Sequence, residues 1–271
     1  MISFLCPVCA SPLKKAEHTY CCANGHSFDI AKSGYVNLLP TGGSGRHGDD
    51  KLMVRARRDF LDAGYYDPLS EGLCAEVVPL LKNYSVLLDA GCGEGKYTVD
   101  LLHALEKNGK TADIIGIDIS KDALIYAAKR SPALHLAVAS SAALPLADGS
   151  VDCVLNIFSP LILEEFSRVL RSSGILMRVI PLEDHLWDLK SLIYDVPYPN
   201  DVPSSDLDGF RLVSTRDLRY RITLEDTDSI LSLFRMTPYY YKAGKADQAK
   251  AEKAESSDTA IAFRILIYEK Y

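Results

Sequence analysis

The sequence has no run of 18 apolar residues, so no segment is suited to cross a membrane as a helix. Its start, MISFLCPVCASPLKK, lacks a basic segment followed by an apolar one, so no signal peptide is visible. We therefore expect a cytoplasmic protein with reduced thiols. Charge of neither sign dominates, since the net charge is −6 in 271 residues, which does not by itself indicate nucleic acid. These absences disfavour integral membrane proteins and disulfide-rich secreted proteins.

The charge that is present is unevenly distributed. Residues 1–58 hold eight lysines and arginines against four acidic residues, whereas the rest of the chain holds 22 basic against 32 acidic residues. A basic N-terminal part on an acidic body is expected if that end meets phosphate groups. Ordinary solvated surface charge is the alternative.

Cysteines are concentrated near the N-terminus, with four of the seven within residues 6–22. In a reducing compartment this favours a metal site over disulfides. The spacing Cys-x2-Cys-x12-Cys-x3-His is typical of zinc fingers, and three thiolates with one imidazole complete a tetrahedron, which predicts a structural zinc without an open position for water. The predicted ligands are Cys6, Cys9, Cys22 and His26. Cys21 is an alternative third ligand and His18 an alternative fourth.

A linker follows the predicted zinc-binding module. Residues 40–50, PTGGSGRHGDD, predict a flexible loop. The next segment, DKLMVRARRDFLDAGYYDPL, has apolar residues at helical spacing, and Gly64 and Pro68 end the helix. This helix carries Arg55, Arg57 and Arg58. These arginines either hold RNA phosphates or pair with Asp59, Asp62 and the acidic body of the protein.

A glycine-rich turn marks the start of the main domain. Residues 86–92, VLLDAGC, predict a buried parallel strand, and GCGEGKYT and a helical pattern follow, as in doubly wound nucleotide-binding folds. The turn fits D-x-G-x-G-x-G, with Asp89 at the strand end, and not the GxGxxG that holds a pyrophosphate. S-adenosylmethionine has no phosphate, and its ammonium and sulfonium favour close backbone and acidic neighbours. The pattern therefore favours S-adenosylmethionine over a nicotinamide cofactor.

Later strand ends supply the other predicted contacts. ADIIGIDIS ends at Asp118, whose carboxylate suits the two ribose hydroxyls. Ser140 and Ser141 follow the third strand, where adenine usually lies; the alternative is that they are ordinary loop residues without a role in binding. Asn156 ends the fourth strand, facing the methyl group, and such strand ends converge on one crevice. The predicted cofactor contacts are Asp89, Gly91, Cys92, Gly93, Gly95, Asp118, Ile119, Ser140, Ser141 and Asn156.

The alternation of strands and helices predicts the fold class. LILEEFSRVLRSSG predicts a helix, GILMRVIP a strand, and FRLVSTRDLRYRITL and TAIAFRILIYEKY a closing strand pair. The expected fold is α/β and Rossmann-like, with a mostly parallel sheet and an antiparallel edge. We divide the chain into a zinc-binding, RNA-recognising module at 1–40, a linker with an arginine-rich helix at 41–75, and a class I methyltransferase domain at 76–271.

Four segments resemble the 23S ribosomal RNA guanine-N1 methyltransferases, a family whose members confer or influence macrolide susceptibility. These segments are CPVC…CANGHSFDIAKSGYVNLLP, DKLMVRARRDFLDAGYYDPL, VLLDAGCGEGKYT and LFRMTPYYYKA. The first and last are specific to the family, whereas the glycine loop marks class I methyltransferases in general. The resemblance implies zinc at the four ligands above, S-adenosylmethionine, and seven strands in the order 3-2-1-4-5-7-6. It also implies a homodimer and a hairpin of domain II of 23S rRNA as substrate, and it leaves open which of two neighbouring guanines is methylated.

Methylation of guanine N1 requires removal of its proton while N1 attacks the methyl group. We expect most of the rate to come from positioning, with modest help from a base that the sequence does not identify. Asn156 and Pro160, in NIFSP, are the predicted catalytic residues, because an amide can hold O6 or the exocyclic amine. Aromatic side chains either stack on an extruded base or pack in the core. These residues are Tyr239, Tyr240, Tyr241, His185 and Trp187.

Two alternative functions remain. A small-molecule methyltransferase, for example one acting on a quinone precursor, shares the glycine loop but has no need of the zinc module. A non-catalytic RNA-binding protein of ribosome assembly has no need of intact cofactor residues.

Overall fold

The N-terminal part of the computed structural model, which describes residues 3–40 and 48–271, is a small antiparallel sheet. Its strands, in spatial order, are β1 (Leu13–Lys15), β2 (Thr19–Cys22) and β3 (Ser27–Asp29). The turn between β2 and β3 closes with the N–H of Gly25 donating to the carbonyl of Cys22 at 3.1 Å. Most of the loop predicted at 40–50 lies outside the described residues.

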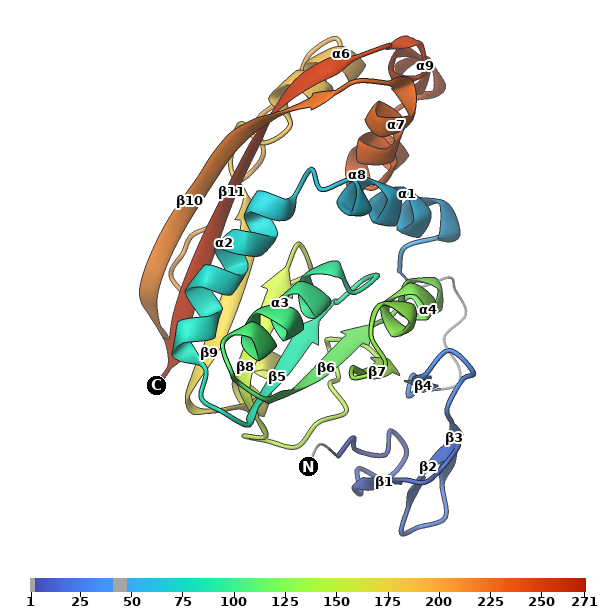
Figure 1. Ribbon diagram of the computed structural model, residues 1–271, viewed down its shortest axis with the longest axis vertical. Helices are drawn as coiled ribbons and strands as arrows, with labels where there is room; N and C mark the ends of the chain where they lie inside the picture. The colour runs from blue at the N-terminus through green and yellow to red at the C-terminus, as the bar shows by residue number, and fades with distance from the viewer. Residues whose placement is uncertain (1–2, 41–47) are drawn as a thin grey trace.

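A sheet with the strand order β10-β11-β9-β8-β5-β6-β7-β4 forms the body of the protein (Figure 1). The strands are β4 (Tyr35–Asn37), β5 (Ser85–Ala90), β6 (Ala112–Asp118), β7 (His135–Val138), β8 (Val151–Ile157), β9 (Leu170–Pro181), β10 (Phe210–Leu224) and β11 (Ser257–Lys270). β11 pairs antiparallel with β9 and β10, and the other pairs are parallel. The mostly parallel sheet with an antiparallel edge is confirmed. Its seven expected strands have the expected order, and β4 adds an eighth along β7.

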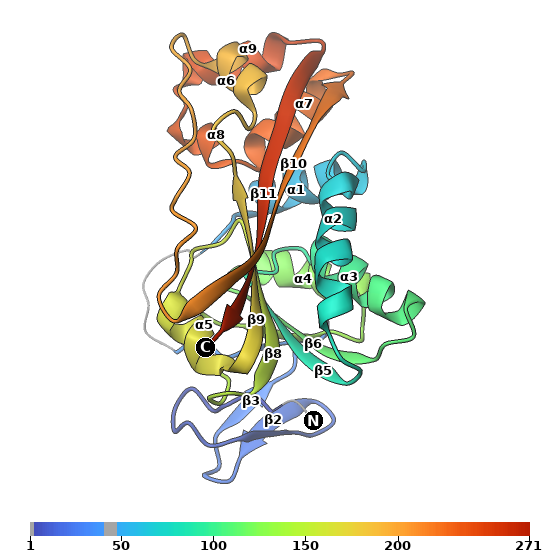
Figure 2. The same cartoon turned by 90° about the vertical axis from the view of Figure 1, so that its left-hand side faces the viewer.

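Helices cover both faces of the sheet and its upper end. They are α1 (Lys51–Asp62), α2 (Asp67–Val77), α3 (Lys96–Lys107), α4 (Lys121–Arg130), α5 (Leu163–Val169), α6 (Trp187–Ile193), α7 (Thr227–Arg235), α8 (Pro238–Lys242) and α9 (Lys245–Lys253), with a short 3-10 turn at Val78–Leu80. In Figure 1, α2, α3 and α4 lie over one face, and α1 and α6 to α9 lie above the ends of β5 to β8, where the long strands β10 and β11 extend up to α6. Figure 2 shows α5 on the opposite face. None of the helices in these described parts of the chain is long and apolar enough to span a bilayer.

Alternate side chains of the central strands build two apolar layers. Leu87 and Ile114 belong to the layer under α2 and α3, whereas the next residues, Leu88 and Ile115, belong to the layer on the other face. Both layers are apolar because a parallel sheet is covered on both sides, which explains the consecutive apolar residues at 86–88.

The zinc-binding module is part of the second layer. Phe4, Leu13 and Tyr20 are buried in the same cluster as Leu88 and Ile115. Backbone hydrogen bonds join the two parts as well: the N–H of residue 5 donates to the carbonyl of residue 145 at 2.8 Å, and that of residue 38 to the carbonyl of residue 138 at 2.9 Å. Removing residues 1–40 would therefore uncover apolar surface on the sheet.

The helix boundaries follow local signals, with one difference from expectation. Asp50 caps α1 by accepting the N–H of Met53 at 2.9 Å, and the chain leaves this helix through Gly64 at φ +82°. Pro68 lies in the first turn of α2, so it begins a new helix where it was expected only to end the previous one. The helix expected from LILEEFSRVLRSSG ends at Val169, because Leu170 already pairs with Val151 in the sheet.

Candidate metal centre and cofactor cleft

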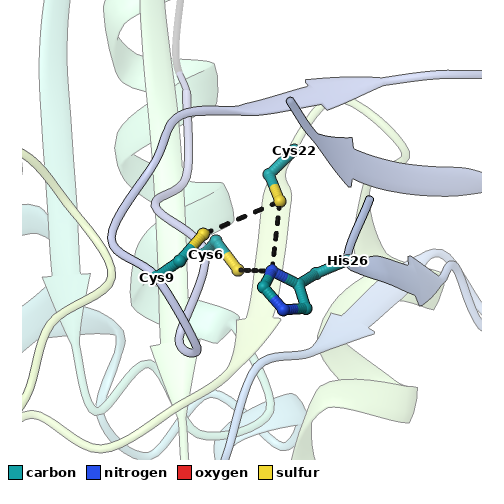
Figure 3. A group of neighbouring side chains, drawn as sticks. All are labelled: Cys6, Cys9, Cys22 and His26. Carbon is teal, nitrogen blue, oxygen red and sulfur yellow. Dashed lines mark hydrogen bonds between the residues drawn. The ribbon is translucent and has the colours of Figure 1, made fainter. Parts of the chain in front are cut away.

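The four predicted zinc ligands come together in the N-terminal module (Figure 3). The Sγ atoms of Cys9 and Cys22 are 3.7 Å apart, and Nδ1 of His26 lies 3.6 Å from Sγ of Cys6 and 3.3 Å from that of Cys22. Zinc bonds of about 2.3 Å to sulfur and about 2.0 Å to nitrogen give tetrahedral edges of about 3.5 to 3.8 Å. The donor atoms therefore fit a structural zinc, which would bind the small module together.

The alternation of side chains along β2 separates the two adjacent cysteines. Cys22 points to the buried side with the other ligands, whereas Sγ of Cys21 lies 3.5 Å from Oγ1 of Thr19 and 3.4 Å from Oγ of Ser27. His18, the alternative fourth ligand, is exposed and lies 3.6 Å from Glu17. The geometry supports Cys22 and His26 as the third and fourth ligands.

A cleft of about 880 Å³ opens at the carboxyl ends of the parallel strands. Predicted cofactor residues that line it are Asp89, Gly91, Cys92, Gly93, Asp118, Ile119, Ser140 and Ser141. Gly95 lies behind the wall, at the N-cap of α3 with φ +86°, where an added Cβ would meet Cα of Ala127 at 3.0 Å. Asn156 does not line the cleft either, whereas Pro160 does. The strand ends thus converge as expected, and two of the predicted residues shape the cleft from behind.

The glycine turn brings backbone to the cleft without side chains. Gly91 has φ +98°, and a Cβ there would lie 2.6 Å from Cβ of Ser159, so only glycine fits. Gly93 has φ +56°, and a Cβ there would meet nothing closer than the Arg57 guanidinium at 4.0 Å. The space beside Gly93 is therefore free for a ligand that approaches the backbone.

Asp89 places a buried carboxylate at the cleft. Its side chain is only 2% exposed, and one carboxylate oxygen accepts the hydroxyl of Thr98 at 2.6 Å. The other oxygen, Oδ1, has no hydrogen-bond partner in the described parts of the chain. Burial raises the pKa of Asp89 to about 7, the Thr98 hydrogen bond opposes this, and nearby Asp118 adds to it. An ammonium group in the cleft would donate a hydrogen bond to Oδ1, and the aminoacyl end of S-adenosylmethionine carries such a group.

Asp118 connects the cleft to the segment before α1. Its carboxylate accepts the N–H groups of Gly93 at 2.9 Å and Ser120 at 2.8 Å, and burial raises its pKa. The Ser120 hydroxyl in turn donates to the carbonyl of Asp49 at 2.8 Å. Arg57 forms an ion pair with Asp49 and donates to the carbonyl of residue 236 at 3.2 Å. These bonds hold the start of α1 across one side of the cleft.

The arginines of α1 have partners within the protein. Arg55 and Arg58 approach the carboxylate of Asp59 at 3.5 Å and 2.5 Å. Arg58 also lies over the ring of Tyr126, 4.7 Å from its centroid. Asp62, by contrast, accepts from Arg130 at 2.7 Å.

Glu94, within the glycine turn, has a role that the motif does not reveal. Its side chain is 2% exposed and forms an ion pair with Arg130, at the end of α4. Burial raises the pKa of Glu94, and the Arg130 charge opposes this. The pair ties the turn to a neighbouring helix 36 residues away in sequence, a partnership that spacing alone does not indicate.

Asn156 organises the turn that carries Pro160. It is buried, and its Nδ2 donates to the hydroxyl of Ser159 at 2.7 Å and to the carbonyls of Ser159 at 3.1 Å and Pro160 at 3.2 Å. The Ser159 hydroxyl donates to the carbonyl of Ala90 at 2.6 Å. Asn156 therefore fixes the wall of the cleft next to the glycine turn.

Aromatic residues line the end of the cleft away from the serines. They are Tyr66, Tyr97, Phe158, His185, Tyr239 and Phe263. Of the three consecutive tyrosines, only Tyr239 reaches the cleft: Tyr240 packs against Phe234, and Tyr241 is 53% exposed with its hydroxyl donating to Asp50 at 2.9 Å. Of His185 and Trp187, only His185 lines the cleft. Tyr66, Phe263 and Arg178 belong to this wall and escaped prediction, because they carry no motif and come from distant segments.

Comparisons with known proteins cover both sites. The family model for the RlmA N-terminal region matches residues 4–42, and that for a methyltransferase domain matches residues 88–177. A Bacillus subtilis (strain 168) protein, provisionally named as a 23S rRNA (guanine-N(1)-)-methyltransferase, is 34% identical over 274 residues, covering 97% of this chain and 96% of the relative. The 23S rRNA (guanine(748)-N(1))-methyltransferase of Streptomyces fradiae is 39% identical over 189 residues, covering 68% of this chain and 65% of the relative.

Proposed function

This chain belongs to the family of 23S rRNA (guanine-N1)-methyltransferases, and we propose that it methylates N1 of a guanine in a hairpin of domain II of 23S rRNA. It is an S-adenosylmethionine-dependent methyltransferase with a zinc ribbon. The observation that carries the proposal is one cleft in which the orphaned carboxylate oxygen of Asp89 and an aromatic wall lie at a glycine turn. This arrangement suits a cationic cofactor beside a flat base.

The chain's own residues would hold the two reactants. Asp89 would accept the cofactor ammonium, the backbone at Gly91 and Gly93 its aminoacyl end, and Asp118 its ribose hydroxyls, with adenine near Ser140. When bound, the cofactor would supply a methyl group to N1, with the electron pair of the carbon–sulfur bond left on sulfur and the N1 proton passed to water. Positioning of N1 against that methyl group is the main contribution expected from the protein.

Asn156 is expected to act by positioning, since its amide holds the 159–160 wall. Replacing Asn156 with Ala frees this wall, and a displacement of about 1 Å at a reacting centre costs roughly 100-fold in rate. We expect kcat to fall by about that factor while the affinity for S-adenosylmethionine, measured by calorimetry, changes little. Asn108→Ala is the matched control, because its Nδ2 donates at 2.8 Å to a carbonyl at the exposed end of α3. Unchanged turnover in Asn156→Ala would remove it from the mechanism.

The zinc-binding module, residues 1–40, is the proposed RNA-recognition part. Lys14, Lys15 and Lys32 are exposed on it, and none of them is in an ion pair with a described residue. Such cations are available for phosphates of the hairpin. The linker at 41–75 then connects this part to the methyltransferase domain at 76–271. We further propose that the protein acts as a homodimer in the cytoplasm, and that the modification alters macrolide susceptibility.

Primer extension on 23S rRNA tests the proposed reaction. N1-methylguanine blocks Watson–Crick pairing, so reverse transcriptase stops at the modified base. We expect a stop in the domain II hairpin in cells with the gene, its loss on deletion, and its return with the wild-type gene but not with Asp89→Ala. The position of the stop identifies the guanine. A pattern of stops that is identical in all these strains would contradict the proposal and favour a small-molecule substrate.

A further inference from the structure

The aromatic end of the cleft contains a buried tyrosine hydroxyl. Tyr66, between α1 and α2, is 5% exposed and lines the cleft. Its hydroxyl is buried and has no partner within residues 3–40 and 48–271. Burial raises the pKa of Tyr66, so the hydroxyl keeps its proton. A buried polar group without a partner costs about 1–3 kcal/mol, and a ligand with an acceptor at this place would remove that cost.

His185, in the turn after β9, lines the same end of the cleft with a fixed tautomer. The N–H of Ala262 donates to its Nδ1 at 3.3 Å, so Nδ1 is unprotonated and Nε2 carries the hydrogen. Burial lowers the pKa of His185 to about 3, and the Lys190 charge contributes, against a smaller opposing effect of Asp184. The ring is therefore neutral in any neutral buffer, and its remaining N–H is directed away from the backbone of β11.

The ring of Phe263 packs against both Tyr66 and His185. Its ring centroid lies 5.1 Å from that of Tyr66 and 4.4 Å from that of His185. Phe158 extends the surface, with its centroid 4.9 Å from that of Phe263. Apolar rings around two polar donors exclude water, which strengthens any hydrogen bond that a ligand makes there.

We propose that Tyr66 and His185 select the target base by donating hydrogen bonds to the O6 and N7 acceptors of guanine, against the Phe158–Phe263 surface. This inference rests on the proposed function and names how its substrate is recognised. Guanine presents two adjacent acceptors on this edge, whereas adenine replaces O6 with an amino donor. N1 lies on the other side of O6 and stays accessible to the methyl group.

The same contacts favour the reaction as well as binding. When N1 loses its proton, negative charge gathers on O6, so a donor already directed at O6 stabilises the transition state more than the ground state. Neutral donors suit this role, because they keep their hydrogens throughout. Loss of either donor should therefore lower kcat and not only raise KM.

A synthetic hairpin RNA with one altered base tests the recognition directly. In 7-deazaguanosine a C–H replaces N7, whereas inosine keeps O6 and N7 and lacks only the exocyclic amine. For the unaltered protein we expect 7-deazaguanosine at the target position to slow methylation roughly 5- to 150-fold, the range for one lost base-edge contact. Inosine should change the rate no more than about threefold.

Single substitutions distinguish the loss of each hydrogen-bond donor from a general loss of folding. Tyr66→Phe removes only the hydroxyl. His185→Asn keeps an acceptor for the Ala262 N–H but has no donor at the Nε2 position, whereas His185→Gln places an amide donor near it. We expect kcat to fall at least fivefold in Tyr66→Phe and in His185→Asn, and to recover partly in His185→Gln. The difference in rate between guanosine and 7-deazaguanosine should disappear in either Tyr66→Phe or His185→Asn, whichever has lost the donor to N7. Tyr268→Phe is the matched control, since this buried phenol donates to residue 205 at 2.9 Å outside the cleft.

Cofactor affinity and melting temperature are measured for each variant, and the 7-deazaguanosine comparison needs no variant at all. Equal rates on guanosine and 7-deazaguanosine, with both variants as active as the wild type, would overturn this inference and leave the proposed function intact. A wild-type protein that binds S-adenosylmethionine but methylates no 23S rRNA hairpin would overturn the proposed function, and this inference with it.

Discussion

Cys22→Ser is expected to abolish zinc binding, lower the melting temperature of the whole protein and eliminate RNA methylation. Structural zinc contributes about 10–16 kcal/mol to the folding of small modules, which lack a sufficient core of their own. Here Phe4, Leu13 and Tyr20 also complete an apolar layer of the main sheet. Loss of the metal therefore uncovers part of the methyltransferase core as well as the small sheet.

Cys21→Ser is the matched control for this experiment, because its sulfur lies on the other side of β2 among Thr19 and Ser27. The measurements are zinc content by mass spectrometry, thermal unfolding and methylation of a hairpin RNA. One zinc per chain is expected in the wild type and in Cys21→Ser. A zinc-free Cys22→Ser with an unchanged melting temperature would contradict the structural role. Loss of zinc from Cys21→Ser would contradict the ligand set.

Asp89→Asn is expected to weaken S-adenosylmethionine binding roughly 10- to 150-fold, the range for a lost hydrogen bond to a charged group. The same change should stabilise the protein without cofactor at pH 8. The pKa of Asp89 in the folded protein, about 7, lies above the ordinary value of 3.8 for an aspartate. Its contribution to stability is thus fully present below about pH 4 and is lost as the pH rises through 7.

Cofactor binding by the wild type should depend on pH in the opposite direction. Below pH 7 Asp89 is protonated in the free protein, so binding of an ammonium group must release that proton, and the affinity should fall up to tenfold for each further pH unit. Calorimetry between pH 5.5 and 8 measures the slope, with Asp122→Asn, an acid of α4 outside the cleft, as control. An equal slope in Asp89→Asn would exclude Asp89 as the titrating group.

Local patterns are sufficient for the parts of this protein whose chemistry depends on neighbours in sequence. The residues of the Cys-x2-Cys and Cys-x3-His spacings come together in the structure, and Gly91 and Gly93 lie at the cleft after a strand, as the pattern predicts. Both patterns predict local geometry because a tight turn or a strand end positions side chains through its own backbone.

The choice between Cys21 and Cys22 lies at the limit of such patterns. Either spacing to His26 suits zinc, and the direction of each side chain depends on the register of β2 with β1 and β3. The register is set by which face of the small sheet is buried against the main domain. The sequence therefore left this alternative open until the tertiary structure resolved it.

The sequence by itself determined the α/β class, the grouping of the four Cys and His side chains and the glycine turn at a strand end, because each depends on short-range spacing or on strand periodicity. Only the tertiary structure decided that β4 extends the main sheet, that the zinc module covers one of its faces, and that Asn156 shapes the cleft from behind. It also brought Tyr66, His185 and Phe263 together from three distant segments. Those contacts arise from burial of apolar surface between elements far apart in the chain, which is non-directional and leaves no local motif.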